Sequence, residues 1–126
     1  MKHWSEKYLL IEYKKMNCAE FVEFVLKKEF GKSYSFPQSK KSIFLDSDQI
    51  KSQLNNYVRK TNSPKDGDLV LMHGKRLMCH IGIYVRIGWT EYVLHTEGSI
   101  KNSSLHRIGD IINYGYTLEG FYKWQK

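Results

Sequence analysis

Apolar residues recur at helical spacing in the first part of the chain and alternate with polar residues in the last part. Trp4, Tyr8 and Ile11 stand at positions i, i+4 and i+7, which predicts a short first helix. A second helix, described below, is predicted at residues 17–30, and a third is predicted to follow a cap at Asp46 or Ser47. Its apolar stripe would consist of Ile50, Leu54, Tyr57 and Val58.

The most regular helical pattern covers residues 17–30. Asn17 can cap the N-terminus, and Glu20 follows three residues later, as in a capping box. Gly31 suits the position just beyond the last turn. One apolar face is formed by Cys18, Phe21, Val22 and Val25.

The pattern changes to that of strands after a loop predicted at residues 63–68. Residues 69–72 form a short apolar run, residues 90–96 a return strand, and residues 116–124 a last strand. Residues 80–87, between the first two of these segments, alternate in character. One face of this strand carries Ile81, Ile83, Val85 and Ile87, and the other carries His80, Gly82, Tyr84 and Arg86. Helices followed by strands predict an α+β fold, with N-terminal helices packed on a central antiparallel sheet.

Composition limits the choice of class. The 126 residues predict a single domain over residues 1–126. The net charge of +7 favours an anionic partner or a well-solvated surface. Because no run of Lys and Arg exceeds two residues, the basic cluster typical of nucleic-acid binding is missing. Two cysteines exclude a disulfide-dense scaffold and leave one bridge, a reactive thiol or two buried thiols open.

No apolar stretch is long enough to predict membrane insertion. Charged residues, Glu6, Lys7 and Glu12, interrupt the first fifteen positions, so we expect no cleaved signal peptide.

Cys18 is the first candidate for chemistry. At the first turn of a helix its sulfur would lie near unpaired backbone N–H groups and the positive end of the dipole, which favours the thiolate. The same N–H groups could hold an oxyanion. Cys18 also lies on the apolar face of the predicted helix, so a buried structural thiol is the alternative.

A catalytic cysteine needs a base, and two histidines can be placed together. If Gly88 and Trp89 form a two-residue hairpin loop, His80 and His95 become diagonal neighbours on one face, about 7–8 Å apart at Cα. Cys18, His80 and His95 would then supply nucleophile, base and orienting group. The alternative is one hydrogen-bonded core histidine and one solvated histidine.

The remaining histidines, His3, His73 and His106, have no partner at a telling spacing, so we expect surface or loop positions. Cys79 precedes His80, and alternation directs it toward the opposite face as a structural residue. For the same reason these two residues cannot both face one zinc ion, which disfavours a metal site.

Four segments together resemble the NlpC family of cell-wall cysteine peptidases, which have a papain-like fold. They are NCAEFVEFVLKKEFG, PKDGDLVLM, CHIGIYV and VLHTEGS, and the resemblance spans residues 13–96. It implies that Cys18 is the nucleophile, His80 the base and His95 the third residue. It also places Tyr13 beside the thiolate.

The resemblance implies hydrolysis of an amide in peptidoglycan stem peptides, next to a D-γ-glutamyl residue, without a cofactor. The tail LHRIGDIINYGYTLEGFYKW is similar to small phage-tail members of the family. Phage-tail or secretion-system proteins are then the expected partners, and a virion tail or delivery to the envelope the expected location. One departure is NCAE at residues 17–20, where the family commonly has Asp-Cys-Ser-Gly; it puts substrate preference in question.

Two alternatives of other classes remain at this point. The same fold supports CHAP-like amidases and thioester-forming acyltransferases, although in the acyltransferases the cysteine follows the histidines. A non-enzymatic basic adaptor for wall polymer or nucleic acid is the other alternative.

Overall fold

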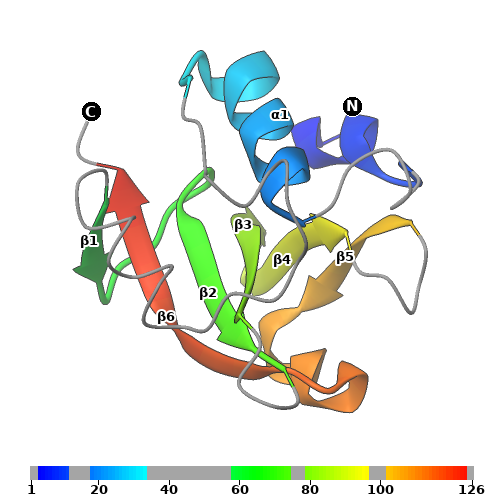
Figure 1. The fold of residues 1–126 in the computed structure, drawn as a ribbon, viewed down its shortest axis with the longest axis vertical. Coiled ribbons are helices and arrows are strands. Elements are labelled where there is room, and N and C mark those ends of the chain that lie inside the picture. Colours follow the sequence, from blue (N-terminus) through cyan, green and yellow to red (C-terminus); the bar gives the residue numbers. More distant parts are fainter. Residues whose placement is uncertain (1–2, 12–17, 34–57, 75–78, 97–101, 125–126) are drawn as a thin grey trace.

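The computed structural model describes residues 3–11, 18–33, 58–74, 79–96 and 102–124, and the statements below concern those residues. Two short 3-10 helices, one α-helix and six strands follow one another along the chain (Figure 1). In order they are η1 (Trp4–Tyr8), α1 (Cys18–Phe30), β1 (Val58–Thr61), β2 (Leu69–His73), β3 (Cys79–Ile87), β4 (Thr90–Thr96), β5 (Ser103–Arg107), η4 (Ile108–Tyr114) and β6 (Thr117–Trp124).

The strands form one sheet in the order β1-β6-β2-β3-β4-β5, and every neighbouring pair is antiparallel. Helix α1 packs against β3 and β4, on one side of the sheet (Figure 1). Helix η4 contacts β4, β5 and β6. The α+β class, with helices on an antiparallel sheet, is therefore confirmed.

Helix α1 is held to the sheet by its apolar face. Phe21, Val22, Val25 and Leu26 are fully buried in a cluster beneath it. Gly31 follows the helix with φ of 65°, the left-handed conformation that glycine adopts without strain. The predicted helix over residues 17–30 thus agrees with the observed bounds, Cys18–Phe30.

The alternation predicted along β3 is also observed. Ile81, Ile83 and Val85 belong to the apolar cluster under α1. Tyr84 belongs to a second cluster on the other face, together with Val70, Met72, Val93 and Ile111. Because apolar residues cover both faces, the central strands β2 and β3 are buried on both sides.

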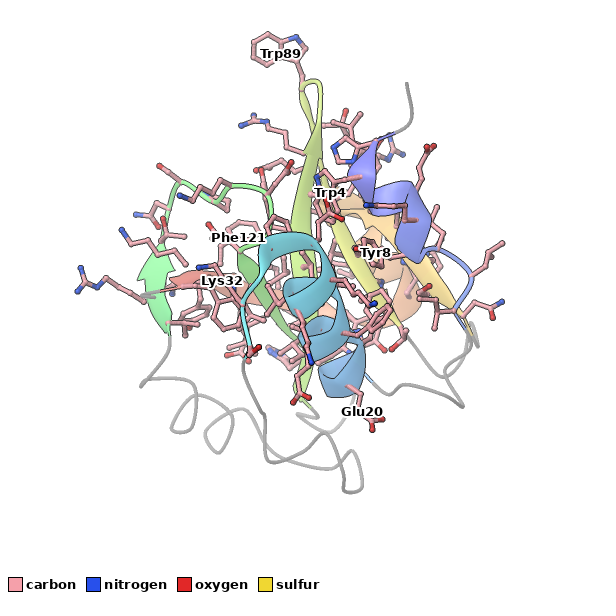
Figure 2. All side chains as sticks on the ribbon, turned by 90° about the horizontal axis from the view of Figure 1, so that it is seen from above. Trp4, Tyr8, Glu20, Lys32, Trp89 and Phe121 are labelled. Carbon is pink, nitrogen blue, oxygen red and sulfur yellow. The ribbon has the colours of Figure 1, made fainter. Side chains whose placement is uncertain are left out.

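The β3–β4 hairpin has the predicted two-residue loop. Ile87 pairs with Thr90, and Gly88 turns the chain with φ of 64°. Trp89, at the tip, is 94% exposed and projects from the molecule in Figure 2. This loop length determines the face on which every residue of β4 lies.

The turn between β1 and β2 accepts hydrogen bonds from three other segments of the chain. Asp66 accepts hydrogen bonds from the Arg86 backbone N–H at 2.7 Å and from the Trp4 indole at 3.1 Å. The carbonyl of Gly67 accepts one from the Trp124 indole at 2.7 Å. The predicted loop at residues 63–68 is confirmed, and it joins the first helix to the sheet.

Several sequence predictions need correction. Val58 is not in a helix: it opens β1, is 5% exposed and pairs with Trp124. The rest of the predicted third helix lies outside the described residues. The first helix is a 3-10 turn that ends at Tyr8, and Ile11 lies beyond it. Strand β5 was missed because its residues, SSLHR, carry no clear apolar period, and its pairing with β4 holds it in place. The short helix η4 was also missed, although Ile108, Ile111 and Ile112 stand at helical spacing.

None of the helices in the described ranges has the length and apolar character needed to cross a bilayer.

Candidate active site

Two histidines meet at the open end of the β3–β4 hairpin, remote from its loop. His80 is near the start of β3 and His95 near the end of β4. Nε2 of His80 lies 2.7 Å from Nδ1 of His95, and the rings meet edge to face with 72° between their planes. The hairpin register places these imidazoles side by side, so this part of the sequence prediction is confirmed.

His106 contacts the other side of the His95 ring. Nε2 of His95 lies 2.9 Å from Nδ1 of His106 on β5. Nε2 of His106 is in turn 3.5 Å from Oγ of Ser104. The prediction that His106 is a surface or loop residue is therefore wrong, because β5 pairs with β4 and no sequence pattern marked β5 as a strand.

Tyrosines cover the two outer rings of this His80–His95–His106 chain. Tyr116 stacks on His80 with centroids 4.4 Å apart and 17° between the planes. Tyr114 stacks on His106 at 4.0 Å and 19°. Both tyrosines flank the end of η4, so this segment defines one wall of the histidine chain.

Burial controls the charge of the central imidazole. His95 is 0% exposed, and His80 is 7% exposed. Desolvation, and then the neighbouring His80 and His106, hold the pKa of His95 well below its ordinary value of 6.5. His95 is therefore neutral at neutral pH, with one protonated nitrogen that donates and one unprotonated nitrogen that accepts.

Gly82 lets β3 and β4 approach closely at the histidine pair. A Cβ at this position would overlap the Val93 side chain and lie 3.0 Å from the Leu94 carbonyl oxygen and 3.1 Å from Cβ of His95. Any larger residue would have to shift the strand that carries His95. The glycine two residues after His80 is therefore required by the packing of β3 against β4.

Cys18 stands where the sequence analysis expected it, as the first residue of α1. It is half-buried at the edge of the apolar cluster under the helix. The N-terminal end of an α-helix carries unpaired backbone N–H groups and a partial positive charge, which stabilise a thiolate. The predicted cap Asn17 and the predicted neighbour Tyr13 lie outside the described residues.

The thiol and the imidazoles come from different sides of the sheet. Helix α1 covers the face that carries Ile81 and Ile83, and alternation assigns His80 and His95 to the other face. His80 and His95 lie near the ends of β3 and β4 that are remote from the hairpin loop. Of the three predicted catalytic side chains, the structure pairs His80 with His95 directly.

The other predicted surface histidines have partners. Nδ1 of His73 lies 3.5 Å from a carboxylate oxygen of Glu119. His3 caps η1 by accepting a hydrogen bond from the Ser5 backbone N–H at 3.3 Å. Cys79 begins β3, and its side chain is outside the described set. Among the described residues, no three His, Cys, Asp or Glu side chains are placed so that they could hold a metal ion.

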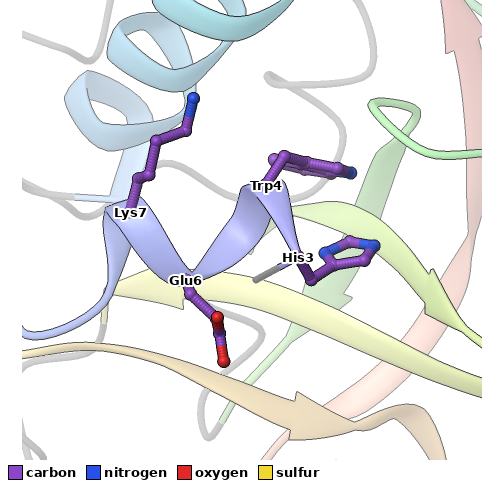
Figure 3. A pocket seen from close by; sticks show the side chains of 4 residues that line it. All are labelled: His3, Trp4, Glu6 and Lys7. Carbon is purple, nitrogen blue, oxygen red and sulfur yellow. The ribbon is translucent and has the colours of Figure 1, made fainter. Parts of the chain in front are cut away.

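A cavity of about 450 Å³ lies beside η1, lined by His3, Trp4, Glu6 and Lys7 (Figure 3). None of the predicted catalytic residues lines it. It is a feature of the N-terminal segment, separate from the histidine chain.

A cysteine that opens a helix, packed on an antiparallel sheet with buried, hydrogen-bonded histidines, is typical of cysteine hydrolases. The comparison with protein families makes this specific: the model of the NlpC/P60 family matches residues 6–117. The chain therefore belongs to the NlpC/P60 family. Its members are cell-wall peptidases and amidases, and generally cysteine peptidases. No curated protein and no solved structure matched the chain.

Proposed function

We propose that this chain is a cysteine peptidase that cleaves an amide bond in peptidoglycan stem peptides. Cys18 is the nucleophile, His80 the general base and acid, and His95 the orienting group. The observation that carries the proposal is the 2.7 Å contact between His80 Nε2 and His95 Nδ1 in a chain of the NlpC/P60 family.

The contact supports one assignment of roles to the two nitrogens of His80. Nε2 faces His95, so Nδ1 is the atom that takes the thiol proton. Neutral His80 then carries its proton on Nε2 and donates it to Nδ1 of neutral His95. After His80 accepts the second proton, the same hydrogen bond persists and stabilises the imidazolium, as the aspartate does in a serine triad.

The reaction follows in two halves. The Cys18 thiolate attacks the carbonyl carbon, and the backbone N–H groups at the start of α1 stabilise the oxyanion. Nδ1–H of His80 passes its proton to the leaving amine as the C–N bond breaks. His80 then removes a proton from water, the hydroxide attacks the thioester, and the C–S bond breaks to regenerate the thiolate.

Finer features of the proposal rest on the family resemblance. The arrangement of nucleophile and base is papain-like, Tyr13 lies beside the thiolate, and the bond cleaved is next to D-γ-glutamyl. The chain acts as one catalytic domain, needs no cofactor, and is delivered to the wall as part of a phage tail or by a secretion system. The net charge of +7 supports an anionic wall as the partner.

The test is a pair of cysteine variants assayed on purified cell walls. Cys18→Ala should abolish release of new amino groups, and Cys79→Ala should retain the activity. In the unmodified protein at neutral pH, iodoacetamide should alkylate Cys18 faster than Cys79, because only Cys18 lies at a helix N-terminus. Full activity of Cys18→Ala would rule out the proposal.

An amidase on the same fold is the second candidate, because the family includes amidases. The two reactions leave different new ends on the wall fragments. Mass spectrometry of the released muropeptides separates them: a cut inside the stem peptide supports the peptidase, and a cut between glycan and peptide supports the amidase.

A further inference from the structure

The half-buried His106 contacts His95, and the proposed mechanism gives it no role. We propose that His106 is a positioning residue: it accepts the Nε2 proton of His95 and so determines which nitrogen of His95 faces His80 unprotonated. The inference rests on the proposed function, because it assigns His80 as the base.

The direction of the hydrogen bonds follows from counting protons. His80 must donate from Nε2 if its Nδ1 is to accept the thiol proton. His95 must then accept at Nδ1, and a neutral imidazole that accepts at Nδ1 carries its proton on Nε2. That proton points at Nδ1 of His106, 2.9 Å away, which is therefore the acceptor. Each nitrogen in these two hydrogen bonds is thus assigned as a donor or an acceptor.

Without His106 the opposite arrangement would be favoured. His95 is 0% exposed, so its Nε2–H has no access to bulk water. A buried donor without an acceptor is costly, and a buried acceptor without a donor is less so. His95 would therefore move its proton to Nδ1 and donate it to Nε2 of His80. His80 would then be protonated on Nδ1, the nitrogen that has to receive the thiol proton.

The surrounding structure holds His106 in the required orientation. On β5 it follows Ser104, the residue that pairs with His95, by two positions, so it lies on the same face of the sheet. Tyr114 stacks on its ring at 4.0 Å, which limits rotation of the imidazole. Ser104 Oγ, 3.5 Å from Nε2, is the group toward which the proton of His106 is directed.

Two variants of His106 separate the acceptor from the packing. His106→Phe keeps an aromatic ring against Tyr114 but has no acceptor. His106→Asn loses the ring but keeps an oxygen at the position of Nδ1. We expect His106→Phe to lower kcat/KM on purified cell walls, and the rate of Cys18 alkylation by iodoacetamide at neutral pH, by about tenfold or more, and His106→Asn to restore most of both.

A role in packing alone gives the reverse order, with the phenylalanine variant more active than the asparagine variant, and that result overturns the proposal. Equal activity of both variants and the unmodified protein also overturns it. Matching unfolding curves for the two variants are the control for folding.

Imidazole ¹⁵N NMR tests the inference without any measurement of activity. In the unmodified protein we expect a proton on Nε2 of His95 and a nitrogen–nitrogen coupling across its hydrogen bond to Nδ1 of His106. In His106→Phe the proton should move to Nδ1 of His95. A proton on Nδ1 of His95 in the unmodified protein contradicts the proposal, even if neither variant folds.

The NMR result also separates the two proposals. If Cys18→Ala retains activity while the proton positions are as expected, the proposed peptidase fails and the assignment of His106 as acceptor stands. If Cys18→Ala is inactive and His95 carries its proton on Nδ1, the assignment of His106 fails alone.

Discussion

The two faces of the sheet differ in what they bury. Under α1 the buried groups are apolar side chains, such as Phe21 and Leu26, which contact other apolar groups and need no hydrogen-bond partner. The opposite face has a smaller apolar cluster and, beside it, polar groups that have hydrogen-bond partners. These are the buried His80, His95 and Tyr84 and the half-buried His106. The face under α1, called the apolar face below, buries the larger apolar cluster. The opposite face, called the polar face below, also carries the hydrogen-bonded histidines that the proposed chemistry needs.

The comparison also shows how differently the faces respond to change. Apolar packing is non-directional, so a small shift weakens many contacts without removing a specific one. A hydrogen-bonded chain depends on the position of each atom, so one displaced strand interrupts it. Substitutions on the apolar face should act on the free energy of unfolding alone, and substitutions on the polar face should act on reactivity as well.

The largest expected effect on stability comes from emptying the apolar face. Leu26→Ala truncates a fully buried side chain under α1, eight residues along the helix from Cys18, and should lower the free energy of unfolding by about 2–5 kcal/mol. Urea denaturation measures the loss. The contrast between the faces predicts little change in the rate of Cys18 alkylation among molecules that remain folded, and a tenfold loss there would contradict it.

Gly82→Ala tests the polar face through its backbone. The new methyl group would meet Val93 and the Leu94 carbonyl, so β4 has to move and His95 with it. We expect a loss of about 1–3 kcal/mol in the free energy of unfolding, typical of overpacking. Unlike Leu26→Ala, this variant should also slow wall hydrolysis per folded molecule. Hydrolysis at the unmodified rate would show that the close approach of the strands is unimportant to the site.

The buried, neutral His95 predicts a pH dependence of stability. Its pKa in the folded state lies well below 6.5, while the unfolded chain has the ordinary value. Below about pH 6.5, His95 binds a proton in the unfolded state but stays neutral in the folded state. The free energy of unfolding therefore falls by up to about 1.4 kcal/mol for each pH unit of acidification. Above that pH both states are neutral and the effect vanishes.

Urea denaturation between pH 7 and pH 5 measures this dependence, with His95→Gln as the matched control. The variant cannot take up the proton, so its stability should fall less steeply over the same range. Identical slopes for the two proteins would contradict the assignment of the loss to His95.

The smallest effect is expected at the hairpin tip. Trp89 is 94% exposed and contributes little to either face. Trp89→Ser should change the free energy of unfolding by less than about 0.5 kcal/mol, as is usual for exposed positions. A larger loss would mean that the loop, and not strand pairing alone, stabilises the register that joins the histidines.

The predictions from sequence were correct for segments that carry both a regular apolar period and a residue that marks their end. Helix α1 combines an apolar period with a terminal glycine, and the β3–β4 hairpin combines alternation with a two-residue loop at Gly88 and Trp89. The register of that hairpin was enough to bring His80 and His95 together. Val58 was misassigned because one β-branched residue fits either period, and only its pairing with Trp124 decides between them.

The sequence by itself determined the class of fold, the position of Cys18 at a helix start and the pairing of His80 with His95, because each depends on local periods and on one short turn. The tertiary structure decided the rest of the histidine chain. His106 lies on β5, a segment with no apolar period of its own, and Tyr114 ends η4, whose isoleucines predict a helical turn but not its neighbours. Both residues reach the site only because β5 pairs with β4 and η4 packs beside it. Contacts between such segments depend on the order of the strands in the folded sheet, which a local period does not specify.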